Sequence, residues 1–140
     1  MSETRKRTIL AVDPGARRFG VAIADLETRF ARPLEVVDAR TADPVARVLE
    51  LARDNASTKV IVGKPIGLAG HEGPAVDAHR DFIERLRAAG MDVTEHDERL
   101  TTVIADQGLR AGGAKAVARK GIRDAVAAQV LLQSYLDGER

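Results

Sequence analysis

Apolar residues follow two patterns along this chain, short continuous runs and repeats at helical spacing, and the two occur in a definite order. Three short stretches come first. We expect the first, a compact apolar run, to be a buried strand and the next two to be strands as well. They cover Thr8 to Val12, Val21 to Ala24 and Leu34 to Val37. Since the connections between them are short, the pattern predicts three antiparallel neighbours.

Helices and strands alternate after the third run. Asp43 followed by Pro44 is typical of an N-cap and a first helical position, and apolar residues then recur at intervals of three and four. The later predicted elements are a strand at Val60 to Val62, a helix from Pro74 that Gly90 ends, a short strand at Val93, a helix capped by Thr101 or Thr102, and a final helix from about Ile122 to Leu136. This order indicates an α/β fold with a mixed sheet and helical crossovers.

The composition is that of an ordinary globular protein, with 44% hydrophobic and 31% charged residues. A length of 140 residues predicts a single domain over residues 1–140. The chain has no cysteine, which excludes disulfides, thiolate catalysis and zinc sites built on sulfur. The apolar run after the charged residues 1–7 is too short for a signal peptide or a membrane span, so we expect a cytoplasmic protein without a membrane partner.

Positive charge is concentrated although the net charge is only +1. Between Arg110 and Arg123 the charged residues are all basic, and Arg17 with Arg18 forms a second basic pair. With three phenylalanines, one tyrosine and no tryptophan, the chain lacks the aromatic residues of a base-stacking platform, so we expect contacts to a nucleic-acid backbone. The candidate nucleic-acid-binding residues are Arg17, Arg18, Lys64, Lys115, Arg119, Lys120 and Arg123.

Three carboxylates occupy positions at which ligands collect. Asp13 ends the first predicted strand, and Asp97 or Glu98 ends the last one, so both acids should lie at the carboxyl edge of the sheet. Asp124 shares a helical stripe with apolar residues that should pack on the sheet. An unpaired charge there would be costly, so we expect a cation to neutralise this carboxylate. The other members of that stripe are Ala127, Ala128, Leu131 and Tyr135.

Each acid alone has an ordinary structural explanation: Asp13 as a turn residue, Glu98 as a solvated acid, and Asp124 as a complement to the helix dipole. Together they would repel one another, and a divalent cation is the usual remedy. Oxygen ligands without cysteine favour Mg²⁺ or Mn²⁺ over zinc. Two such ions about 3.5–4 Å apart suit phosphodiester hydrolysis, so we expect a metal-dependent nuclease with two ions.

Four segments that span nearly the whole chain form a set of motifs. They are 11–15 (AVDPG) with 20–22 (GVA), 62–65 (VGKP) with 70–74 (GHEGP), 96–102 (HDERLTT) and 120–128 (KGIRDAVAA). In this order they resemble the motifs of the YqgF/RuvX family, and the third and fourth segments together are specific.

The resemblance implies a ribonuclease H-like fold related to Holliday junction resolvases, and a nuclease that matures the 5′ end of pre-16S rRNA. It also implies that the catalytic and metal-binding acids are Asp13, Glu98 and Asp124. The family pattern, rather than spacing, selects Glu98 over Asp97. The second motif departs from the family pattern at Lys64, Gly67 and Ala69.

Three other activities compete with a nuclease acting on precursor rRNA. A resolvase for branched DNA would use the same chemistry and would normally be a dimer, because it makes two symmetric cuts. A non-catalytic nucleic-acid-binding module would have lost a carboxylate, whereas all three are present. A phosphotransferase would share the D-x-G opening but needs a second lobe, for which 140 residues are too few.

Overall fold

The structure, a computed structural model, describes residues 7–64, 74–97 and 116–138. Within these ranges it describes only the backbone at 74–76, 97 and 116–124.

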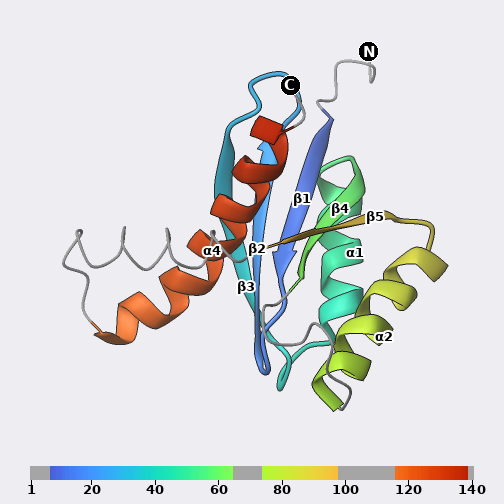
Figure 1. Ribbon diagram of the computed structural model, residues 1–140, viewed down its shortest axis with the longest axis vertical. Coiled ribbons are helices and arrows are strands. Elements are labelled where there is room, and N and C mark those ends of the chain that lie inside the picture. The colour runs from blue at the N-terminus through green and yellow to red at the C-terminus, as the bar shows by residue number, and fades with distance from the viewer. Residues whose placement is uncertain (1–6, 65–73, 98–115, 139–140) are drawn as a thin grey trace.

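Five strands form one mixed sheet in the order β3-β2-β1-β4-β5 (Figure 1). The first three strands are antiparallel neighbours, and β4 and β5 extend the sheet parallel to β1. This arrangement confirms the predicted mixed α/β sheet. The strands are β1 (Thr8–Asp13), β2 (Arg18–Asp25), β3 (Ala31–Asp38), β4 (Ser57–Lys64) and β5 (Asp92–Asp97).

Helices cover both faces of the sheet (Figure 1). The helices α1 (Pro44–Asp54) and α2 (Pro74–Ala88) pack on one face, and α4 (Ala116–Gly138) packs on the other, against β1, β2 and β3. None of the helices in the described ranges is long and apolar enough to cross a membrane.

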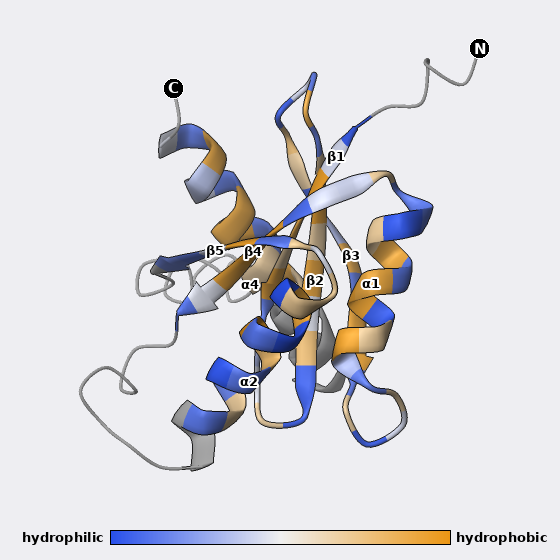
Figure 2. Cartoon of the chain, turned by 90° about the vertical axis from the view of Figure 1, so that its right-hand side faces the viewer, coloured by the Kyte–Doolittle hydropathy of each residue, from blue (hydrophilic) through white to orange (hydrophobic). Residues whose placement is uncertain are grey.

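The two-sided core explains why the central strands were visible as continuous apolar runs. Along β1, Leu10 and Val12 pack with α1 and α2, whereas Ile9 and Ala11 pack with α4. All four side chains are buried, as strands covered on both faces require. Figure 2 shows this apolar colouring along the strands and on the helix faces turned toward them.

The boundaries of several elements differ from those predicted. The strands β2, β3 and β4 extend beyond their apolar runs because ladder hydrogen bonds join backbones whatever the side chains are. The final helix begins at Ala116, before the predicted Ile122, because its first turns carry no apolar repeat. Gly90 ends the α2 region as predicted, with a φ of 96° that favours glycine. The helix predicted at Thr101 or Thr102 lies outside the described residues.

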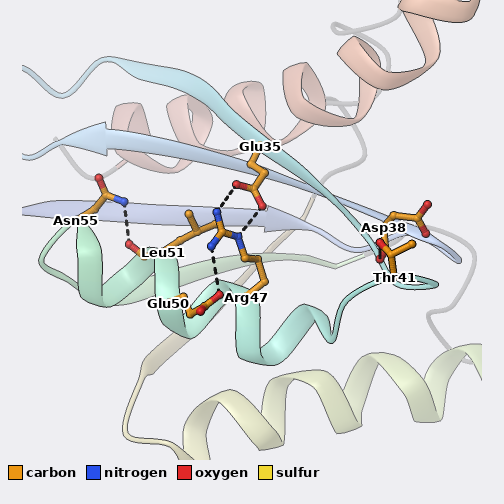
Figure 3. A network of polar contacts seen from close by, with 7 residues as sticks. All are labelled: Glu35, Asp38, Thr41, Arg47, Glu50, Leu51 and Asn55. Carbon is orange, nitrogen blue, oxygen red and sulfur yellow. Dashed lines mark hydrogen bonds and ion pairs between the residues drawn. The ribbon is translucent and has the colours of Figure 1, made fainter.

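Ion pairs tie α1 to its neighbours on the α1/α2 face. Arg47 of α1 donates two hydrogen bonds of 2.7 Å to the carboxylate of Glu35 on β3, and a third of 3.2 Å to Glu50 (Figure 3). Asp43 caps α1 by accepting from the backbone N–H of Val45, and it also accepts from Arg85 of α2 at 2.9 Å. These contacts fix the orientation of α1 relative to β3 and α2.

Acid should weaken the fold through these carboxylates. Hydrogen bonds from Arg47 and Arg85 lower the pKa of Glu35 and of Asp43 from their ordinary values of 4.5 and 3.8. The stabilisation is therefore present above the unfolded-state pKa values and is lost as the pH falls through the lowered native values. In urea titrations between pH 7 and pH 3, Glu35→Gln should be less stable than wild type at pH 7, and the difference should shrink in acid. Glu84→Gln, at an exposed position of α2, is the control. A difference between Glu35→Gln and wild type that stays constant with pH would contradict this assignment.

Candidate functional site

Asp13 is the last residue of β1 and is half-buried at the carboxyl edge of the sheet. Side chains alternate between the faces of a strand, so Asp13 belongs to the set of Ile9 and Ala11, which face α4. The carboxylate predicted from the strand end therefore lies on the α4 side of the sheet. We call this region, bounded by Asp13 and the ends of β4 and β5, the α4-side edge.

The three parallel strands bring their carboxyl ends together, as the sequence predicted. Val12 is in register with Val62 of β4, and Gly63 is in register with His96 of β5. Asp13, Gly63 and His96 thus form one row across the α4-side edge. The backbones of Asp13 and His96 are two strands apart, about 10 Å at ordinary strand spacing. Gly63 contributes no side chain between them.

The two faces of β5 each carry one histidine contact. On the α4 side, Nε2 of His96 is hydrogen-bonded to Oγ of Ser134 at 3.1 Å, and the His96 ring meets the Tyr135 ring edge-on with centroids 5.8 Å apart. On the other side, Glu95 is hydrogen-bonded to Nε2 of His79 of α2 at 3.2 Å. The sequence could not reveal the contact between His96 and Ser134, which joins residues 38 positions apart.

The other two predicted acids are only partly located. Glu98 follows β5 directly in the chain and lies outside the described residues. Asp124 belongs to α4, where the structure describes its backbone alone. The other members of its predicted stripe are all buried, which confirms the sheet-facing side of α4 at Ala127, Ala128, Leu131 and Tyr135.

No group of three metal-binding side chains occurs within the described parts of the chain. Of the three predicted metal-binding acids, Asp13 is the one whose side chain the structure describes. It offers a half-buried carboxylate at the end of a central strand. Together with Glu98 and Asp124 it would form an all-oxygen donor set. Such a set fits Mg²⁺ or Mn²⁺.

The basic residues fall into two groups relative to Asp13. Arg17 is exposed and Arg18 is half-buried, and they follow Asp13 in the turn into β2, at the same edge of the sheet. Lys64 is exposed at the end of β4, but alternation with Val60 and Val62 puts it on the α1/α2 face. Lys115 lies outside the described residues, and the side chains of three further residues in the first turns of α4 are not described: Arg119, Lys120 and Arg123.

Gly15 controls the turn that follows Asp13. A Cβ at this position would meet the carbonyl oxygen of Arg18 at 2.5 Å, so any other residue would force the turn open. We expect Gly15→Ala to lower the free energy of unfolding by about 1–3 kcal/mol, as overpacking typically does, and to displace Arg17 and Arg18. Urea denaturation measures the first effect. Gly138→Ala is the control because its Cβ would meet nothing within 4 Å; equal losses in both variants would contradict the explanation.

The chain is similar to a known family and to curated relatives over nearly its whole length. The model of one family, described as "RuvX: Holliday junction resolvase", matches residues 7–138. A relative from Chloroflexus aggregans is 40% identical over 137 residues and covers 96% of both chains. One from Anaeromyxobacter dehalogenans is 44% identical over 130 residues, covering 91% of this chain and 95% of its own. Both relatives carry the name "Putative pre-16S rRNA nuclease".

Two solved structures share the fold at low identity. RuvC of T. thermophilus, in complex with a Holliday junction substrate, superposes with a TM-score of 0.56 at 19% identity and covers 95% of both chains. The large terminase nuclease from the thermophilic phage G20c gives a TM-score of 0.56 at 18% identity, covering 94% of this chain and 83% of its own. These likenesses show a RuvC-like fold, which confirms the predicted ribonuclease H-like mixed sheet.

Proposed function

This chain belongs to the RuvX family of nucleases, and on that premise we propose that it is a metal-dependent endonuclease that processes the 5′ end of pre-16S rRNA. The observation that carries the proposal is the position of Asp13. It ends a central strand on the face covered by α4, the helix to which Asp124 belongs. A strand and a helix that each supply an acid to one edge can hold a cation between them.

In the proposed site Asp13, Glu98 and Asp124 hold two Mg²⁺ or Mn²⁺ ions. Glu98 is chosen over Asp97 because the family motif at 96–102 selects it. Ions held there would supply what phosphodiester hydrolysis requires, activation of the attacking water and stabilisation of the leaving oxygen. The chain's own part is to fix the three carboxylates and to hold the nucleic-acid backbone.

Two sets of basic residues are proposed to bind the substrate. Arg17 and Arg18 follow Asp13 at the same edge of the sheet, and Lys115, Arg119 and Lys120 form the basic stretch of the sequence at the start of α4. Arginine and lysine bind phosphate oxygens without reading the base sequence, so we propose that these residues recognise the shape of the nucleic-acid backbone. We propose Lys64 and Arg123 as further phosphate contacts. Because Lys64 lies on the α1/α2 face, it would contact a part of the nucleic-acid backbone that extends over that face.

Removing the basic stretch should weaken RNA binding and flatten its salt dependence. Each basic side chain that no longer binds a phosphate reduces the slope of log K against log salt by about 0.7–0.9. Changing Lys115, Arg119 and Lys120 to alanine should therefore reduce the slope by about 2–3 in total, measured by fluorescence anisotropy at several salt concentrations. Arg53 and Arg80, exposed on α1 and α2, are the controls, and an equal effect there would mean that the stretch is an ordinary solvated surface.

A resolvase for branched DNA is the second candidate. It is favoured by the family description and by the fold shared with a RuvC structure bound to a Holliday junction. The relatives at about 40% identity favour the rRNA substrate instead.

A metal-dependent digestion panel tests the proposal. Purified protein with Mn²⁺ or Mg²⁺ is offered precursor rRNA, single strands, duplexes and a four-way junction, with sedimentation run in parallel. We expect cleavage of the rRNA precursor near the 5′ end of 16S rRNA and none in chelator. Symmetric cutting of the junction by a dimer, with the rRNA left intact, would replace the rRNA proposal by the resolvase. If none of these nucleic acids is cleaved, the nuclease proposal is wrong and a non-catalytic binding module replaces it.

A further inference from the structure

The acids of the proposed site belong to two different parts of the fold. Asp13 ends a strand of the sheet, whereas Asp124 belongs to α4, which packs across that sheet. The separation of their carboxylates therefore depends on how α4 is seated. Metal affinity is sensitive to such seating because ligands must hold their geometry to within about 0.5 Å.

On the β3 side, α4 is fastened by glutamine side chains. Gln129 donates to the carbonyl oxygen of Ala31 at 3.1 Å, and Gln133 accepts from the backbone N–H of the same residue at 2.9 Å. Gln133 also donates to the carbonyl oxygen of Arg29 at 3.0 Å. These contacts lie where β3 begins, at the edge of the sheet away from Asp13, since β3 runs in the same direction as β1.

On the β5 side, α4 is fastened at His96. Its Nε2 is bonded to Ser134, its ring packs edge-on against Tyr135, and the ammonium group of Lys59 lies 5.3 Å from the centre of that same ring. Tyr135 is only 9% exposed, so this contact is closely packed. His96 is also in the cross-strand row of Asp13, so on the sheet this contact lies at the α4-side edge. On α4 the contact lies at Ser134 and Tyr135, ten and eleven residues after Asp124.

We propose that His96 is a positioning residue of the metal site, which sets the distance between the sheet and α4 through its hydrogen bond to Ser134. The proposal rests on the proposed function, because it assumes that Asp13 and Asp124 share a cation. His96 does not itself bind the metal in this account. Its imidazole holds α4 against the end of β5 and so fixes the seating of the helix to which Asp124 belongs.

Direct Mn²⁺ binding, measured without substrate by the electron paramagnetic resonance signal of the free ion, tests the proposal. His96→Phe keeps a ring against Tyr135 but removes the hydrogen bond, and Ser134→Ala removes the partner at an exposed position. Each should weaken Mn²⁺ binding about tenfold, the lower end of what outer-shell partners of metal ligands cost. The double variant should bind Mn²⁺ no more weakly than either single variant, because the two substitutions remove the same hydrogen bond. His96→Gln, which retains a hydrogen-bonding side chain, should recover most of the affinity.

The opposite face of β5 provides the matched control. His79→Phe removes the hydrogen bond between α2 and Glu95, so it should change thermal stability as His96→Phe does, with Mn²⁺ affinity unchanged. If His96→Phe fails to fold, Ser134→Ala carries the test alone. Wild-type Mn²⁺ affinity in Ser134→Ala, together with lost affinity in Asp13→Asn, would overturn the role of His96 and leave the proposed function intact. Wild-type affinity in Asp13→Asn would instead overturn the proposed function.

Discussion

Asp13→Asn should abolish metal-dependent cleavage while leaving the fold intact. Asparagine keeps the shape of the side chain at the end of β1 but removes the charge that a divalent ion requires. We expect cleavage of the preferred nucleic acid to fall by about three orders of magnitude, equivalent to about 4 kcal/mol of transition-state stabilisation. Asp124→Asn should have the same effect. Single-turnover cleavage with saturating Mn²⁺ is the measurement.

Asp25→Asn is the matched control for this prediction. Asp25 is also a half-buried aspartate that ends a strand, but its partner across the ladder is Thr8, at the opposite edge of the sheet from Asp13. Its Oδ1 accepts from the backbone N–H of Glu27 at 2.7 Å, which an asparagine oxygen can still do. Asp25→Asn should therefore cleave as wild type does. Equal losses in the two variants, or cleavage that survives Asp13→Asn, would remove the metal site from the α4-side edge.

A second measurement separates loss of metal from loss of fold. A ligand that binds only the native state adds about 2.7 kcal/mol to the free energy of unfolding when its concentration is a hundred times its dissociation constant, and it thereby raises the unfolding temperature. Mn²⁺ should raise the unfolding temperature of wild type and of Asp25→Asn, but not that of Asp13→Asn. Without metal, the three proteins should unfold at similar temperatures.

The elements that could be predicted from sequence are those whose burial leaves a pattern. Three of the four buried residues of β1 are large and apolar, with Ala11 as the fourth, so the strand is visible as a run. By contrast, β5 has Val93 as its buried apolar residue and lies at an edge of the sheet, which gives a weak signal. The first turns of α4 carry basic residues and small residues, and the apolar spacing starts only where the helix meets the sheet.

The candidate site was predictable to the extent that its members follow from single elements. The position of Asp13 follows from the end of a strand, and the stripe of Asp124 follows from helical spacing, which its buried neighbours confirm. The ion pair of Glu35 with Arg47 and the contact of His96 with Ser134 depend on how separate elements dock. No local pattern records such docking. The meeting of Asp13, Glu98 and Asp124 also depends on the docking of separate elements, so it stays a prediction.

The largest effect on stability is expected at the contact of α4 with the sheet. Leu131 is fully buried in the cluster that joins α4 to β1, β2 and β4, beside Ala128 and Leu132. Leu→Ala at such positions costs about 2–5 kcal/mol, through reduced burial and the cavity left behind. We expect Leu131→Ala to lower the free energy of unfolding by about 3 kcal/mol and the unfolding temperature by about 10 °C. Leu26→Ala, on the turn after β2 and 41% exposed, should change either quantity little.

Leu131→Ala and Asp13→Asn should therefore fail in opposite ways. The leucine variant loses stability but keeps the acids, so at low temperature it should still bind Mn²⁺ and still gain unfolding temperature from it. The aspartate variant keeps its stability and loses both responses. If Leu131→Ala loses Mn²⁺ binding while it remains folded by circular dichroism, α4 has moved without unfolding. The metal site would then depend on the seating of that helix more than on the hydrogen bond at His96, and the double variant with Ser134→Ala would measure how the two contacts share that role.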